Sequence, residues 1–155
     1  MHMKPRECWS VLANKAEDIV ALNQQAVKAA REHLEKLQAS KERLVSMSNE
    51  YAQKIREKEQ TTQSLIESNN ARQFVLQLLH LRDRLDKDVD QARAQLDEAL
   101  QALRHADQER LKMQTLVEQD LLAVKTYHRQ LEQKQMDALG LTLFNMKSVA
   151  MNERA

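Results

Sequence analysis

The side chains that could do chemistry are few and scattered along the chain. The five histidines never stand four residues apart, so no pair has the spacing with which a helix binds a metal ion. We therefore expect structural or surface roles for them and no metal site; they are His2, His33, His80, His105 and His128.

Asp86, Asp88 and Asp90 alternate like the first ligands of a calcium-binding loop. Such a loop also needs a glycine and a terminal glutamate at fixed positions, and the sequence has neither there. We interpret the three aspartates as part of a solvent-exposed helix face.

Cys8 is the single cysteine, so an internal disulfide is excluded, which fits a reducing cytoplasm. No His or Asn pattern surrounds it that would activate a thiolate. The single glycine, Gly140, cannot build a glycine-rich phosphate loop. Because an enzyme also needs a concave site, we expect neither catalysis nor a cofactor.

The composition is typical of long helices. Gly and Pro number one each, aromatic residues make up 3%, and 24 basic residues balance 23 acidic ones. This charge balance argues against a nucleic-acid binder and against a disordered polyelectrolyte. No apolar run approaches the roughly 20 residues that cross a bilayer, and the N-terminus lacks the apolar core of a signal peptide. We therefore expect a cytoplasmic protein without direct membrane insertion.

An apolar repeat of 3.5 residues runs from Val89 to Leu141, and only Arg110, Asp120 and Lys134 interrupt it. A repeat of this length predicts another helix packed along it. Its members are Val89, Ala92, Leu96, Ala99, Leu103, Ala106, Arg110, Met113, Val117, Asp120, Val124, Tyr127, Leu131, Lys134, Ala138 and Leu141.

A second row with the same period runs from Val27 to Ile55 and can supply that partner helix, although Lys41 and Ser48 interrupt it. Before Val27 two adjacent stripes are apolar, one through Val20 and one through Ile19 and Leu22. The packing face of this earlier stretch stays open.

These patterns predict an all-α fold, a long antiparallel two-helix coiled coil that forms a single helical hairpin over residues 1–155. We expect a first helix over about 6–60, a turn within about 59–70, and a second helix over about 70–139. Gly140 would end this helix, and an apolar tail would cover 140–155. The alternative is one continuous helix that dimerises in parallel; the loss of the repeat where a midpoint turn would fall favours the hairpin.

Apolar residues near both ends of such a hairpin are either seam residues or docking patches. Tyr51, Phe74, Leu78 and Leu81 would lie toward the turn. The other end would bring Trp9, Val11 and Leu12 beside Leu143, Phe144 and Met146.

Three short motifs in order add a family resemblance: Asn49-Glu50-Tyr51, Gln73-Phe74 and Gln133-Lys134-Gln135-Met136-Asp137. With them the chain resembles the flagellar FliJ family, soluble components of the flagellar type III export apparatus. One departure is Ala138-Leu139-Gly140, where family members often continue with an acidic residue.

The resemblance implies a non-catalytic stalk and adaptor that supports flagellum assembly and motility. Its implied partners are the hexameric export ATPase, the cytoplasmic domain of the membrane export gate, and export chaperones. It also implies a cytoplasmic protein that associates peripherally with the inner face of the cell membrane through the export apparatus. The alternatives are the equivalent stalk of a virulence type III secretion system and a general coiled-coil scaffold.

The resemblance also implies two protein-binding sites. The patch facing the export gate would comprise Leu44, Met47, Tyr51, Phe74, Leu78, Leu81 and Leu85. The end facing the ATPase ring would comprise Trp9, Leu12, Leu141, Leu143 and Phe144.

Overall fold

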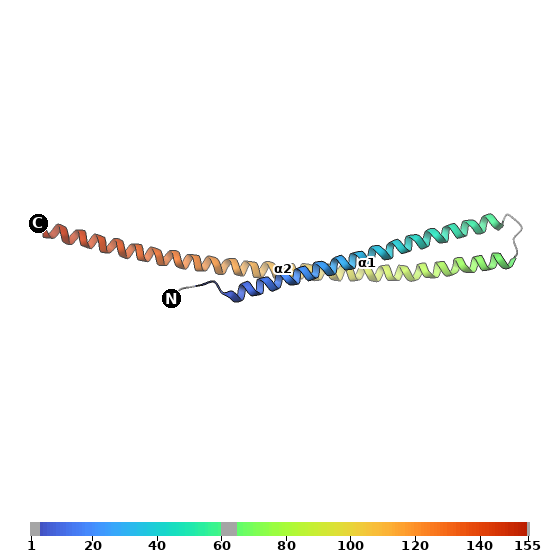
Figure 1. Ribbon diagram of the computed structural model, residues 1–155, viewed down its shortest axis with the longest axis horizontal. Coiled ribbons are helices and arrows are strands. Elements are labelled where there is room, and N and C mark those ends of the chain that lie inside the picture. Colours follow the sequence, from blue (N-terminus) through green and yellow to red (C-terminus); the bar gives the residue numbers. More distant parts are fainter. Residues whose placement is uncertain (1–3, 60–64, 155) are drawn as a thin grey trace. The chain divides into compact units, whose positions relative to one another are not determined.

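A computed structural model describes residues 4–59 and 65–154, which form two long helices and contain no strand. Helix α1 covers Glu7–Glu59 and helix α2 covers Leu65–Glu153. The helices pack against each other as the antiparallel arms of a helical hairpin (Figure 1), which confirms the predicted fold class.

Both helices contribute to each of two compact units. The hairpin unit is Ile19–Ala106, and the terminal unit joins Met1–Asp18 with Asp107–Ala155. Neither helix has an apolar stretch of the length that spans a bilayer, as far as the described residues go.

The core of the hairpin unit is narrow and follows the predicted rows. Val27 and Ser48 are buried on α1, and Val89 and Ala92 are buried on α2. The Ser48 hydroxyl donates a hydrogen bond of 2.8 Å to the carbonyl oxygen of Leu44. This bond satisfies the one buried polar residue of the row, so the row tolerates a serine.

The structure also decides which early stripe of α1 packs against α2. Val20 is buried, whereas Ile19 and Leu22 are exposed. The stripe that contains Val20 and Val27 therefore faces α2, and the neighbouring stripe remains on the surface.

In the terminal unit the α2 repeat is covered only in part. Its members from Arg110 to Tyr127 are buried or half-buried, but every described residue from Arg129 to the end is exposed. The far end of the repeat is therefore uncovered, as expected from a partner row, Val27 to Ile55, that is shorter than the repeat. Helix α1 begins at Glu7, beside Asp120, whose carboxylate accepts a hydrogen bond from the backbone N–H of Arg6, so α1 does not extend along α2 beyond Tyr127.

The expected bounds of the second helix are also corrected. Helix α2 begins at Leu65 and continues through Gly140 to Glu153, so residues 140–153 are helix and not a separate tail. Gly140 has no positive φ and therefore does not adopt the left-handed conformation of a helix terminator. A lone glycine costs a helix only about 1 kcal/mol, and the Leu, Met and Ala residues around it favour the helix. The central part of the predicted turn, residues 60–64, lies outside the described residues.

Candidate protein-binding surfaces

Ion pairs join the two helices of the hairpin unit. Lys41 of α1 pairs with Asp86 of α2, and the two side chains are about equally exposed, at 39% and 40%. Lys41 interrupts the apolar row of α1, and in the structure its positive charge is paired with the negative charge of Asp86 on α2. Charged pairs of this kind select one register between coiled-coil helices.

The ends of the two helices nearest the turn are linked by Glu59. Glu59 is the last residue of α1, and it forms an ion pair with Arg72 of α2. Its Oε1 atom also accepts a hydrogen bond of 3.5 Å from the Ser68 hydroxyl. These contacts hold the two helix ends together on either side of residues 60–64.

Two aromatic residues from opposite helices meet on the surface of the hairpin unit. The ring centroids of Tyr51 and Phe74 are 4.8 Å apart with an interplanar angle of 55°. This tilted arrangement suits the charge distribution of aromatic rings. Tyr51 is 39% exposed and Phe74 38%, so the pair closes the edge of the seam and still presents an apolar face to solvent.

The other predicted members of the gate-facing patch differ in exposure. Met47 and Leu81 are exposed on α1 and α2, whereas Leu44 and Leu85 are half-buried. Leu78 is only 5% exposed and belongs to the core. The surface that a partner can reach therefore consists of Met47, Tyr51, Phe74 and Leu81, which we call the aromatic patch.

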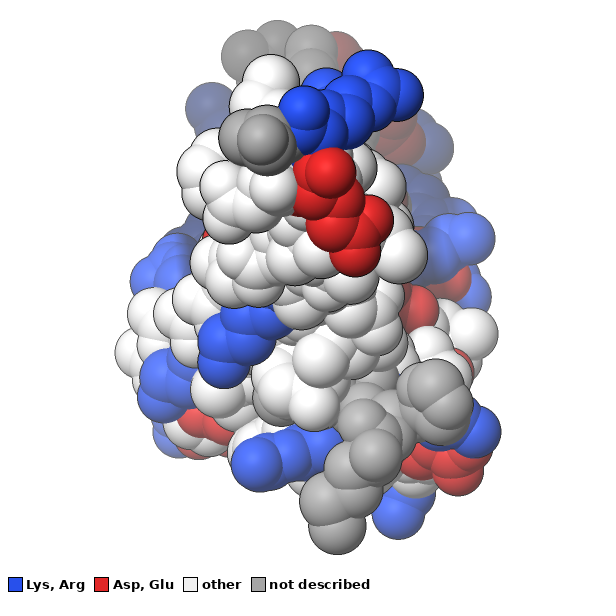
Figure 2. Space-filling view, turned by 90° about the vertical axis from the view of Figure 1, so that its left-hand side faces the viewer, with Lys and Arg blue, Asp and Glu red and all other residues white. Residues whose placement is uncertain are grey.

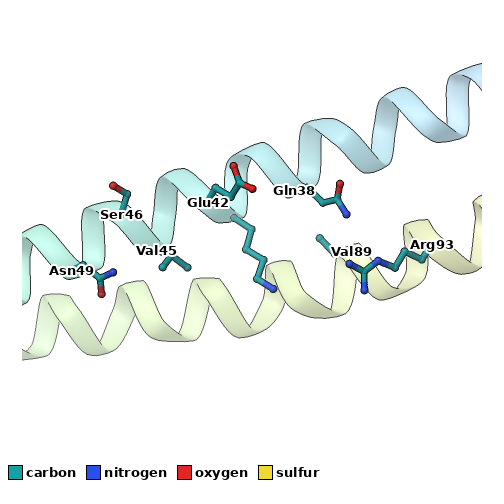
Figure 3. A pocket seen from close by; sticks show the side chains of 8 residues that line it. Gln38, Glu42, Val45, Ser46, Asn49, Val89 and Arg93 are labelled. Atoms are coloured by element: carbon teal, nitrogen blue, oxygen red, sulfur yellow. The ribbon is translucent and has the colours of Figure 1, made fainter.

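A shallow groove lies farther from the turn along the same seam (Figure 3). Helix α1 supplies most of its lining, and Val89 and Arg93 come from α2. The lining combines amides, a carboxylate and two cations around two valines, a chemistry suited to hydrogen bonding and ion pairing. The α1 residues are Gln38, Lys41, Glu42, Val45, Ser46 and Asn49.

Sequence reasoning missed apolar residues nearer the turn. Leu65, Ile66 and Leu76 are exposed on α2. Leu76 also lines a small apolar groove with Ile55 and Val75. The heptad spacing could have identified Leu76, because an apolar residue that lies off the packed row of α2 is expected to be exposed.

In the terminal unit the N-terminus of α1 is anchored to α2. The backbone N–H of Arg6 donates a hydrogen bond of 2.7 Å to Oδ2 of Asp120, whose side chain is 15% exposed. The backbone N–H of Trp9 donates to the Arg6 carbonyl oxygen at 3.2 Å. Asp120, which interrupts the apolar repeat of α2, thus supplies an acceptor and a negative charge at the positive end of α1.

The two halves of the predicted ATPase-facing end are not brought together. Trp9 is half-buried and Leu12 is exposed near the anchor at Asp120, whereas Leu141 and Phe144 lie more than twenty residues farther along α2. At 1.5 Å per residue this separation is about 30 Å. Sequence reasoning placed them together because it ended the second helix near residue 139.

Among the described residues, no other helix covers the last part of α2. We call residues 129–153 the C-terminal overhang; its apolar side chains are all exposed, with Phe144 at 71% and Leu141 at 65%. Figure 2 views the molecule from the side on which α2 ends and shows mostly uncharged surface there, with isolated charged residues. The exposed large apolar residues are Leu131, Met136, Leu139, Leu141, Leu143, Phe144, Met146, Val149 and Met151.

The described residues contain no group of three His, Cys, Asp or Glu side chains that could hold a metal ion. Cys8 is exposed at the start of α1. What the arrangement provides is apolar surface on helices, which suits binding to other proteins.

Comparison with known proteins agrees with this picture. The model of one protein family, described as flagellar FliJ protein, matches residues 11–148. The match covers the described part of α2 almost to its end and nearly all of α1. No curated protein and no solved structure matches the chain.

Proposed function

This chain belongs to the flagellar FliJ family and is a component of the flagellar export apparatus, and we propose that it acts there as a non-catalytic stalk and adaptor. In this role it binds the hexameric export ATPase with one surface and the cytoplasmic domain of the membrane export gate with another. It also assists export chaperones and so supports flagellum assembly and motility.

The observation that carries the proposal is the C-terminal overhang. Leu141, Leu143 and Phe144 are all exposed, and because successive residues of a helix are rotated by about 100°, they point to different sides of α2. A helix that is apolar on all sides needs a partner that surrounds it. The central opening of a hexameric ring is such a partner, and the ATPase would enclose the overhang.

Trp9 and Leu12 support this contact from a second position. They lie near Asp120, about 30 Å along α2 from Leu141. In our proposal the overhang enters the ring, and the start of α1 meets the rim. The two predicted parts of the ATPase-facing end then contact the ring at different depths, the overhang inside its opening and Trp9 and Leu12 at its rim.

The aromatic patch supports the contact with the export gate. Its residues come from both helices of the hairpin unit, and the Tyr51 and Phe74 rings hold each other in place. A preorganised aromatic pair loses little conformational entropy when a partner covers it, as binding hot spots require. We propose Met47, Tyr51, Phe74 and Leu81 as the contact residues, with Leu78 as the core residue beneath them.

The proposed location follows from these partners. The protein is cytoplasmic and reaches the inner face of the cell membrane through the ATPase and the gate. The same stalk role in a virulence type III secretion system is the second candidate, since the two systems share this architecture. The neighbouring genes separate the two: flagellar genes beside this one favour the first candidate.

The proposal is tested by adding the full chain to the purified hexameric ATPase from the same cell. We expect co-purification and faster ATP hydrolysis at micromolar concentrations of this protein. A variant with Leu141→Glu and Phe144→Glu should lose most of the stimulation, and Ser148→Glu, a substitution on the same overhang, should retain more of it. Absence of both binding and stimulation by the unaltered protein would refute the stalk function.

A further inference from the structure

In the part of the hairpin unit nearest the turn, α2 carries two overlapping rows of residues that can pack against α1. One row is buried or half-buried along its length. The row beside it shares Leu78 and Leu85 but passes through Phe74 and Leu81, which are exposed. The packed row consists of Ala71, Val75, Leu78, Arg82 and Leu85.

Helix α1 has the same two choices. Its 3.5-residue spacing leads through Ser48 to Tyr51 and Ile55. In the structure, however, Ala52 is half-buried between Ser48 and Ile55, and Tyr51 is 39% exposed. The packed row of α1 therefore runs from Leu44 to Ser48 to Ala52 in two steps of four, which is a stutter in the heptad repeat.

The packed rows hold the smaller and more polar side chains. Arg82 occupies a seam position on α2, and its guanidinium lies 3.7 Å from the Asp83 carboxylate of the same helix. Ala52 and Val75 line an open groove, so their side chains leave one edge of the seam unfilled. The larger apolar side chains of the aromatic patch remain outside the seam.

We propose that this part of the hairpin switches between an open arrangement, which the structure shows, and a closed one in which Tyr51, Phe74 and Leu81 enter the seam. Successive residues of a helix are about 100° apart, so replacing every second seam residue by its neighbour turns each helix by about 50° about its own axis. The shared residues stay in the seam in both arrangements. The residues that leave the seam are Ala52, Val75 and Arg82.

The contact between the two aromatic rings shows that rotation alone produces this exchange. Tyr51 and Phe74 already meet, with ring centroids 4.8 Å apart, so the two exposed rows lie along the same edge of the seam. Ala52 and Val75 line one groove in the same way. Because the helices are antiparallel, rotation in the same sense about each axis moves both exposed rows inward together, and neither helix has to slide along the other.

Two opposing effects decide the balance. The closed arrangement removes two aromatic side chains and a leucine from solvent and lets Arg82 extend into water, which favours it. The open arrangement keeps alanine and valine where the closed one needs room for two rings, and overfilling a narrow seam is unfavourable. We therefore expect the closed arrangement as a minor state with a population of roughly 1–10%.

The exchange regulates access to the aromatic patch. In the open arrangement the patch faces solvent, and in the closed one its aromatic pair and Leu81 are covered by the opposite helix. A partner that binds the patch selects the open arrangement and so holds the packed rows in place. The identity of this partner as the export gate rests on the proposed function, whereas the exchange itself does not.

Fluorine NMR of the full chain tests the exchange. The chain contains two phenylalanines, so labelling with 4-fluorophenylalanine gives one signal from Phe74 and one from Phe144. We expect saturation transfer or relaxation dispersion to detect a minor state for Phe74 on the microsecond-to-millisecond timescale. Phe144 is 71% exposed and lies outside the hairpin unit, so its signal is the internal control and should not respond to the substitutions below.

Matched substitutions should shift the balance in opposite directions. Val75→Gln puts an amide into the open seam and should raise the ratio of closed to open roughly tenfold, with a smaller change of the Phe74 signal between H2O and D2O because the ring is less exposed. Leu81→Gln puts the same amide into the closed seam and should abolish the minor state. Arg82→Leu adds an apolar side chain to the open seam and should abolish it as well. Arg84→Leu, the same replacement at an exposed position off both rows, should leave the exchange unchanged.

Two results would overturn the proposal: a Phe74 signal without a minor state in both the unaltered protein and Val75→Gln, or a minor state that Leu81→Gln and Arg82→Leu leave unchanged. The last two substitutions keep the test decisive if Val75→Gln unfolds the chain. Since no partner is present, these results are independent of the proposed stalk function.

A binding measurement with the cytoplasmic domain of the export gate tests the regulation. Val75→Gln should bind roughly twofold more weakly, in proportion to the fraction of the chain that stays open. Arg82→Leu should bind as well as the unaltered protein. Equal affinity of Val75→Gln and the unaltered protein, together with the expected NMR result, would overturn the regulation of the patch and leave the exchange established.

Discussion

Asp120 of α2 accepts a hydrogen bond of 2.7 Å from the backbone N–H of Arg6, immediately before α1 begins at Glu7. An acidic residue that breaks the apolar repeat of one helix thus caps the start of the other. The contact fixes where α1 begins relative to α2, and it therefore also fixes how much of α2 is left uncovered.

Removal of this cap should loosen the start of α1. Asp120→Ala should cost about 1 kcal/mol of local stability, the usual effect of losing a helix cap. Amide hydrogen exchange over residues 10–16 should then be roughly fivefold faster. Asp120→Asn keeps an oxygen acceptor, so its exchange rate should lie between those of Asp120→Ala and the unaltered protein. Equal exchange rates in all three proteins would show that the cap contributes nothing to stability.

The pair of Lys41 and Asp86 should contribute little to stability. Both side chains are more than a third exposed, so a double-mutant cycle with Lys41→Ala and Asp86→Ala should give a coupling of about 0.2–1 kcal/mol. The coupling, measured by urea denaturation, should decrease as salt is added. A coupling that is independent of salt would contradict an electrostatic origin.

Alanine substitutions of Phe74 and Leu78 should have different effects, one mainly on partner binding and the other mainly on stability. Leu78→Ala removes a buried side chain and should cost about 2 kcal/mol or more, measured by thermal or chemical unfolding. Phe74→Ala removes a side chain that is 38% exposed and should cost less. Phe74→Ala should nevertheless reduce binding to the export gate and impair motility. If it lowers stability as much as Leu78→Ala does, Phe74 acts mainly as a core residue.

Gly140→Ala should stabilise the C-terminal overhang. Gly140 lies within α2 without a positive φ, and nothing lies within 4 Å of a Cβ atom at that position. Alanine favours a helix over glycine by about 1 kcal/mol. Amide exchange over residues 136–146 should therefore slow roughly fivefold, while the unfolding of the hairpin unit stays the same. Faster exchange would mean that Gly140 marks a helix end in solution.

The spacing of apolar residues in the sequence predicts much of the fold. Because an α-helix repeats every 3.6 residues, the rows from Val27 to Ile55 and from Val89 onward determine two helices and the faces by which they pack. The absence of glycine and proline from both rows leaves no place for another break. The aromatic patch also follows from this spacing, since Tyr51 and Phe74 lie beside the packed rows.

Only the tertiary structure decides which of these faces are covered. Periodicity alone treats Leu131 and Leu141 like Val124, yet Val124 is buried and the other two are exposed. Burial depends on whether the partner helix reaches that level, and α1 begins at Glu7, next to the contact between Arg6 and Asp120. For the same reason the sequence determines that the overhang is apolar, and the packing of α1 determines that it remains open to a partner.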